Sequence, residues 1–307
     1  MYALQSEHAA AWPALPVDDW EPTRATLHMW TQIVGKVRLA LSPYVNHWWQ
    51  VPLYVTPRGL TTSAIPHGES SFEIEFDFLT HNLELRGSNG SAKAVPLYAR
   101  SVADFYREFR AVLDAMGIGA RIWPMPVEVS YPIPFPEDQE HAAYDPRYVE
   151  AFHRTLLSLD KVLKKFRGGF LGKASPVHFF WGSFDLAVTR FSGRPAPPRE
   201  GADKITREAY SHECSSAGFW PGIAGMSDAA LYSYTAPEPS GFAHAKVRPQ
   251  AARYDHTLRE FLLMYEDVRQ SPDPAGMILE FCESTYDAGA SLGKWDRSAL
   301  ERKQESL

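Results

Sequence analysis

The residues best suited to chemistry lie in one stretch, PVHFFWGSFDLAVTRFSGR, which runs from Pro176 to Arg194. This stretch has the aromatic density of a buried strand pair, yet it contains His178, Asp185 and Arg190. Titratable and charged side chains are rarely buried without a partner or a task. We therefore expect a reactive or ligand-binding centre to form here.

The path of the backbone decides whether these side chains can cooperate. In one straight strand over residues 177–191, His178 and Arg190 would share a face but lie about 40 Å apart at ~3.3 Å per residue. Asp185 would then face the opposite side. A straight strand therefore excludes a shared site for these three residues.

A hairpin gives a different result. Gly182-Ser183 can form a two-residue turn, because glycine suits the first central position of a type II′ turn. Phe180 then pairs with Asp185, and His178 becomes a diagonal neighbour of Asp185 on one face. A glycine bulge within one strand is a third possible path and would shift the faces.

A carboxylate beside an imidazole raises the basicity of the imidazole and fixes its tautomer, as acid–base catalysis requires. We predict His178 as the acid or base and Asp185 as the residue that orients it. Arg190 or Arg194 would bind an anionic group through two parallel hydrogen bonds. The alternative is a buried His–Asp hydrogen bond that serves packing alone.

A second set of candidates lies in SHECSSAGFWPGIAG, which we interpret as a small-residue loop over residues 211–225. His212 and Glu213 are the second candidates for acid–base catalysis, and Cys214 is a nucleophile only if a base lowers its thiol pKa. The alternative is a turn with helix-capping serines. Aromatic rings often line ligand pockets, and we expect three of them to form walls here. These three are Trp48, Trp181 and Trp220.

Sequence motifs for metals and nucleotides are absent. The 11 histidines show no HxxxH, HExxH or HxH spacing, and the two cysteines form no CxxC pair. Phosphate-binding glycine motifs and the GxSxG elbow are absent as well. We therefore predict no metal and no cofactor, with a metal site assembled by the fold from His178, His212 and Glu213 as the alternative.

Composition limits the partners. The 307 residues carry a net charge of −6, which gives no general attraction to nucleic acid or to an anionic membrane. The N-terminus lacks the pattern of a signal peptide, and no apolar run approaches the roughly 18 residues of a membrane helix. Two cysteines in so long a chain favour a reducing cytoplasm. We expect a cytoplasmic protein with a small-molecule ligand.

The order of elements predicts an α+β fold, with a mostly antiparallel sheet and helices packed on one face. We expect a single domain over 1–307, with an extended arm over 1–20 and a polar tail over 297–307. The clearest strand is FEIEFDF, residues 72–78, with one buried phenylalanine face and one acidic face in water. The predicted helices cover residues 22–34, 102–116, 145–167, 255–269 and 274–292. The other predicted strands cover residues 37–41, 48–56, 60–65, 82–86 and 230–236.

Several stretches together resemble an uncharacterised bacterial family known only as a domain of unknown function. They include WEPTRATLHMWTQIVGKVRLAL, NHWWQVPLYVTPRGLTTSAIPHG, SPVHFFWGSFDLAVTRFSGR and SHECSSAGFWPG. The resemblance extends from about Trp20 to Asp296. It implies a bacterial origin and one family-wide domain, and it supplies no catalytic residues.

The residues predict a protein that binds or acts on a small polar or anionic molecule in an aromatic-lined pocket, with His/Asp acid–base chemistry. Two other functions fit the same sequence. A non-catalytic ligand-binding protein would have the pocket without a His–carboxylate contact. A protein-interaction module would instead expose its aromatic residues and proline-rich loops as an apolar patch.

Overall fold

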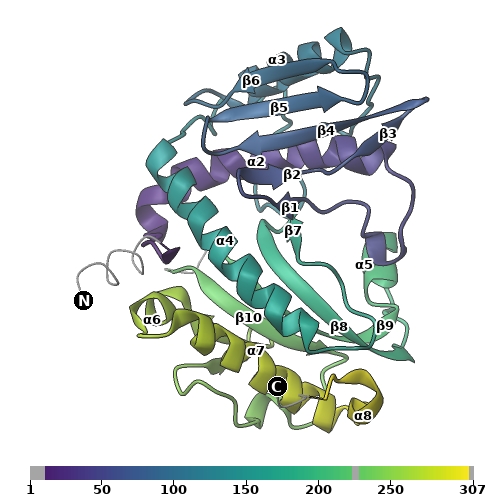
Figure 1. Cartoon of the computed structure of the whole chain (residues 1–307), viewed down its shortest axis with the longest axis vertical. Helices are drawn as coiled ribbons and strands as arrows, with labels where there is room; N and C mark the ends of the chain where they lie inside the picture. Colours follow the sequence, from purple (N-terminus) through teal and green to yellow (C-terminus); the bar gives the residue numbers. More distant parts are fainter. Residues whose placement is uncertain (1–10, 223–227, 304–307) are drawn as a thin grey trace.

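The computed structural model describes residues 11–222 and 228–303 and contains two antiparallel sheets with helices packed against them (Figure 1). The predicted α+β class is confirmed. Short helical segments lie between and after the main elements. They are η1 (Asn46–Trp48), α5 (Lys204–Ala209), η2 (Phe242–His244), α6 (Tyr265–Gln270) and α8 (Arg297–Leu300).

The first sheet is built from the N-terminal half of the chain. Its strands follow the order β1 (Tyr54–Val55), β2 (Gly59–Thr61), β4 (Ser70–Asp77), β5 (Asn82–Gly87) and β6 (Ala92–Pro96). Strand β3 (Ile65–His67) also pairs with β4. The helices α2 (Val17–Leu41) and α3 (Val102–Ala115) contact this sheet, and the Ser101 hydroxyl caps α3 as its sequence predicts.

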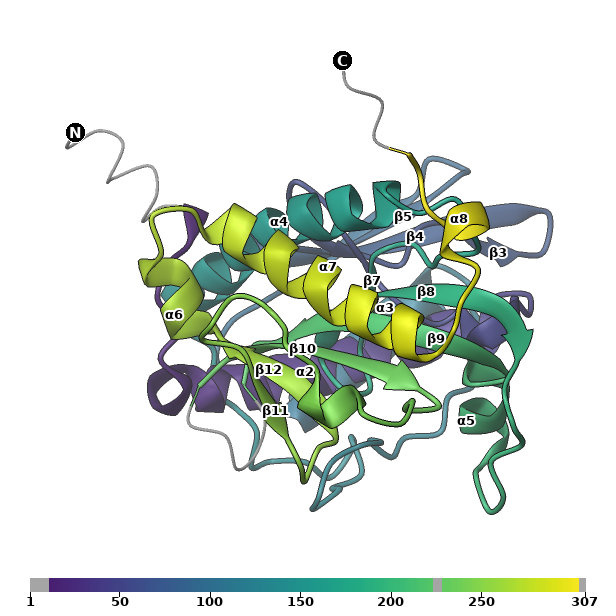
Figure 2. The same ribbon diagram turned by 90° about the horizontal axis from the view of Figure 1, so that it is seen from below.

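The second sheet contains the segment that we expected to carry chemistry. Its order is β11 (Arg253–Asp255), β12 (Glu260–Met264), β10 (Ala230–Ala236), β9 (His212–Trp220), β8 (Asp185–Pro195) and β7 (His178–Phe180). The long helices α4 (Pro146–Gly168) and α7 (Pro274–Leu292) lie on one face of it (Figure 2). A bridge between Leu53 and Phe179 joins the two sheets.

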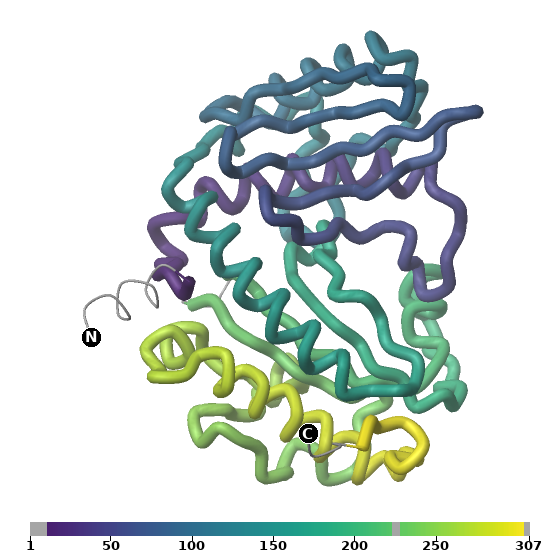
Figure 3. Tube along the Cα trace, in the orientation of Figure 1, coloured from purple at the N-terminus to yellow at the C-terminus, as the bar shows by residue number. Residues whose placement is uncertain are grey.

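Helix α2 corrects three predictions at once. It crosses the width of the molecule as one helix of 25 residues (Figure 3), so the strand predicted over 37–41 is wrong. The predicted extended arm also ends early, because the helix begins at Val17; residues 1–10 of that arm lie outside the described residues. The helix predicted over 22–34 is also longer at its C-terminal end, because it continues through Gly35, where Trp181 packs closely.

The chain between 211 and 270 departs most from prediction. The supposed loop over 211–222 contains strand β9, and residues 223–225 lie outside the described residues. Both faces of β9 are buried, so its small residues give no alternating pattern. The helix predicted over 255–269 is the hairpin β11–β12 followed by α6. The predicted polar tail forms α8 and then a bridge between Phe170 and Glu301.

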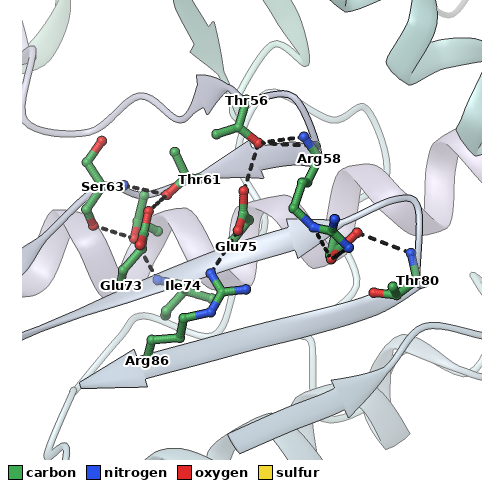
Figure 4. A network of polar contacts seen from close by, with 12 residues as sticks. Thr56, Arg58, Thr61, Ser63, Glu73, Ile74, Glu75, Thr80 and Arg86 are labelled. Atoms are coloured by element: carbon green, nitrogen blue, oxygen red, sulfur yellow. Dashed lines mark hydrogen bonds and ion pairs between the residues drawn. The ribbon is translucent and has the colours of Figure 1, made fainter. Parts of the chain in front are cut away.

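Strand β4 buries its acidic face as well as its phenylalanine face, which corrects the prediction of a face in water. Glu75 accepts a hydrogen bond of 2.8 Å from Arg86 (Figure 4), and Asp77 accepts one of 2.6 Å from Arg58. Both carboxylates are less than 9% exposed. Buried carboxylates on this sheet therefore have arginine partners.

Arg190 holds the second sheet to its helices. It is 1% exposed on the face of β8 that packs against α4, where its guanidinium donates to the Phe166 carbonyl and lies 3.3 Å from Glu283. The guanidinium carbon lies 3.4 Å from the centre of the Phe166 ring and 4.4 Å from that of Tyr286. Arg190 is buried among these groups, which departs from its predicted role in anion binding.

We expect Arg190→Ala to lower the free energy of unfolding by about 3 kcal/mol, because it removes a buried cation and its packing. Arg190→Met should recover more than half of that loss, since its unbranched chain fills much of the same volume. Urea denaturation of both variants measures these values. An Ala variant within about 0.5 kcal/mol of the wild type would contradict this role.

Candidate functional site

A cavity of about 1300 Å³ lies on the face of the second sheet opposite α4 and α7. Strands β7, β8, β9, β10 and β12 contribute its floor, and α2, α5 and the loop over 121–128 contribute its sides. The three predicted wall tryptophans line it, and so do three tyrosines that we did not predict. These six residues are Trp48, Trp181, Trp220, Tyr210, Tyr232 and Tyr234.

The hairpin β7–β8 has the register that we predicted. Phe180 pairs with Asp185, and His178 pairs with Ala187. The turn itself differs from the predicted type II′ turn, because the positive φ of 57° lies at Phe184 and not at Gly182. Residues 181–184 form the connection, which is therefore four residues long.

Asp185 lies on the cavity floor and is 3% exposed. Its carboxylate accepts hydrogen bonds from the hydroxyls of Ser183 and Tyr232. Burial outweighs these two bonds and raises the pKa of Asp185 to about 6, from an ordinary 3.8. The carboxyl therefore changes its protonation state close to neutral pH.

Tyr232 reaches Asp185 because residue 218 is a glycine. The tyrosine ring lies over Gly218 on the neighbouring strand, and a Cβ there would be 2.4 Å from the phenolic oxygen. Trp220 stacks on the same ring, with 4.4 Å between the ring centres. The contacts with Gly218 and Trp220 thus fix the position of the Tyr232 hydroxyl against Asp185.

Two further acids belong to the cavity, and sequence reasoning missed both of them. Glu260 is 7% exposed, and burial together with the charge of Asp185 raises its pKa to about 8. Glu128 is exposed at the mouth, where packing around its carboxyl and then Asp185 raise its pKa. We had placed Glu260 in a helix and Glu128 in a proline-rich connection, so neither was a candidate.

His178 does not reach the cavity or form the predicted pair. It is completely buried among the rings of Trp49, Tyr54 and Phe180, with ring centres 5.3–5.6 Å apart. Neither imidazole nitrogen has a hydrogen-bond partner within the described residues, and burial lowers the pKa of His178 to about 3. The predicted His178–Asp185 hydrogen bond is therefore wrong, because aromatic rings cover the histidine and Asp185 bonds to Tyr232.

Arg194, Glu213 and His212 also lie outside the cavity walls. Arg194 donates to Glu213 at 2.6 Å and to the carbonyl of Gly293 at the end of α7. This pair ties β8 and β9 to α7, and Arg194 therefore acts at the end of that helix and not in the cavity. His212 contacts the Ser211 hydroxyl at 3.1 Å.

Cys214 lines the cavity, but its side chain stays protonated at neutral pH. Burial raises the pKa of Cys214 to about 12, so the nucleophilic thiolate is not formed at neutral pH. Across residues 11–222 and 228–303, no group of three His, Cys, Asp or Glu side chains is arranged to hold a metal ion.

Lys36 is the buried cation of the cavity. It is 6% exposed on α2, and its amino group lies 5.3 Å from the ring centre of Trp123 and 5.7 Å from that of Trp181. Burial lowers the pKa of Lys36 to about 8. Cation–π contacts of this kind stabilise a charge that has lost its water.

Comparisons with known proteins assign the chain to a family. No curated protein and no solved structure matches the chain significantly. No helix in the part of the chain that the structure describes is long and apolar enough to cross a membrane. One family model, described as "Family of unknown function (DUF5996)", matches residues 12–302. The chain therefore belongs to this family, as the resemblance of its sequence to a domain of unknown function predicts.

Proposed function

We propose that the protein binds a small organic molecule in the aromatic cavity and exchanges a proton with it through Asp185. The observation that carries this proposal is the Asp185 carboxyl on the cavity floor, with a pKa of about 6. A carboxyl with a pKa near the working pH is suited to act as both acid and base. Aromatic walls around a few polar groups are typical of small-molecule sites.

The neighbours of Asp185 support this role. Ser183 and Tyr232 each donate a hydrogen bond to the carboxylate, which fixes its orientation. A ligand that fills the cavity would displace water from the carboxylate and strengthen its electrostatic interactions. The proton-exchanging role that we first assigned to His178 thus passes to Asp185, while Trp48, Trp181 and Trp220 keep their proposed role as walls.

Ligand binding can be tested with 2-naphthylmethanol, an uncharged aromatic probe. We expect saturable binding, measured by tryptophan fluorescence, and a loss of at least tenfold in affinity in Ser216→Leu. Ser216 faces the cavity from β9, so the larger side chain would occupy ligand space. Ser70→Leu, at the exposed start of β4 in the other sheet, is the matched control and should bind normally. Equal affinity in both variants would remove the cavity as the binding site.

The protonation of Asp185 makes a prediction about stability. The pKa of Asp185 is higher in the folded state than in the unfolded state. Between about pH 4 and 6 the folded state therefore binds one more proton than the unfolded state. Wild-type stability falls as the pH rises through this range. Asp185→Asn removes this loss. The free energy of unfolding of the variant minus that of the wild type should therefore be about 2 kcal/mol larger at pH 8 than at pH 4.5.

Urea denaturation at the two pH values measures this difference. Asp114→Asn, an exposed change on α3, is the control and should show no such dependence on pH. If Asp185→Asn has the same effect on stability at pH 8 and pH 4.5, Asp185 does not titrate as proposed.

A further inference from the structure

Three carboxyl groups of the cavity, those of Asp185, Glu260 and Glu128, have no cationic partner, unlike Glu238 in the same cavity and the other buried acids in the described residues. Elsewhere, Glu75 and Asp77 pair with arginines (Figure 4), and Asp160 pairs with Lys164 at 2.6 Å. In the described residues, no Lys, Arg or His nitrogen lies within 4.0 Å of the carboxylates of Asp185, Glu260 or Glu128. The missing partner is thus a property of these three acids and not of the chain.

Glu260 carries the argument furthest. Its side chain is more than nine-tenths buried and lines the cavity, and no hydrogen bond or ion pair to either carboxylate oxygen is formed within the described residues. A buried carboxylate without a partner is costly. Asp185 and Asp255 add repulsion, and no cation offsets it. When Glu260 is ionised, its charge therefore has no counter-ion within the described residues.

Three of the four Lys and Arg side chains that line the cavity are engaged elsewhere, and the fourth, Arg121, is exposed. Arg259 lies 3.5 Å from Glu238, and the Arg199 guanidinium lies 3.8 Å from the centre of the Tyr210 ring. Lys36 lies between Trp123 and Trp181. Each of these groups has its own aromatic or acidic neighbour, so none of them neutralises the acids on the floor.

The aromatic rings beside these acids are suited to bind a cation. Tyr232 stacks between Trp220 and Tyr234, with ring centres 4.4 Å and 6.2 Å away. Aromatic faces attract cations, and they do so more strongly when the cation is removed from water. Tyr234 lies on β10, the strand that pairs with β12, which carries Glu260. Carboxylates and aromatic faces thus occupy the same part of the cavity.

We propose that the ligand of this cavity is an organic cation, an ammonium group on an aromatic or aliphatic body. Its charge would lie among Glu260, Asp185 and Glu128, and its body would lie against the rings of Trp220 and Tyr232. This inference rests on the proposed binding function and names its ligand class. It replaces the anionic ligand that Arg190 and Arg194 suggested, since both arginines lie outside the cavity.

Three probes of one shape test the charge preference: 2-naphthylmethylammonium, 2-naphthylmethanol and 2-naphthoate. At pH 8, titration by calorimetry should give the ammonium at least a tenfold lower Kd than either of the others. If the alcohol or the carboxylate binds as tightly as the ammonium, this inference fails and the binding function stands. If none of the three probes saturates, the binding function fails with it.

Substitution of Glu260 locates the charge. Glu260→Gln should weaken binding of the ammonium about tenfold and leave binding of the alcohol within twofold. Glu128→Gln, at the exposed mouth, is a second variant that does not put folding at risk and should weaken ammonium binding two- to fivefold. Glu69→Gln, in the exposed turn before β4, is the matched control. Equal weakening of ammonium and alcohol in the cavity variants would overturn the assignment.

Discussion

The packing of one turn against α2 determines the form of the site. The indole of Trp181 lies directly on Gly35, where a Cβ would be 2.3 Å from the ring. His28 donates a hydrogen bond of 2.8 Å to the Gly182 carbonyl, and the Trp181 indole donates one of 2.8 Å to the Val51 carbonyl. These contacts hold the turn over 181–184 between the helix and the chain that leads into the first sheet. Asp185 follows directly, so its place on the cavity floor depends on them.

The same face of α2 also positions the mouth of the cavity. Gln32 lies one turn after His28, and its amide exchanges two hydrogen bonds with the backbone of Val127, at 2.8 Å and 2.9 Å. Glu128 follows with a positive φ of 57°, a conformation that is uncommon outside glycine. Lys36 follows one turn further along the helix. Residues spaced at three and four along a helix share a face, so one helix aligns the turn, the loop and the buried cation.

The sequence predicted the register of the β7–β8 hairpin but not the partner of its aspartate. Strand parity determines which face a residue occupies, and it correctly placed Asp185 and His178 on the same face. It does not determine which neighbouring ring covers each residue, so the burial of His178 under Trp49 and Tyr54 was not predictable. Tyr232 was missed because its strand pairs with β9, whose central run of small residues, 214–218, we interpreted as part of a loop. Glu260 was missed for a similar reason, because the hairpin β11–β12 has a helix-like spacing of apolar residues.

The two faces of the second sheet treat buried charge in opposite ways, and this contrast bears on function. On the helix face, Arg190 has a carboxylate, a carbonyl and two rings around it. On the cavity face, Asp185 and Glu260 hold pKa values of about 6 and about 8, which means that ionising them works against folding. Elsewhere in the described residues, buried acids such as Glu75, Asp77 and Asp160 are paired with Arg or Lys. A bound molecule that supplied a counter-ion would offset this loss of stability, which supports the proposal that this face binds the ligand.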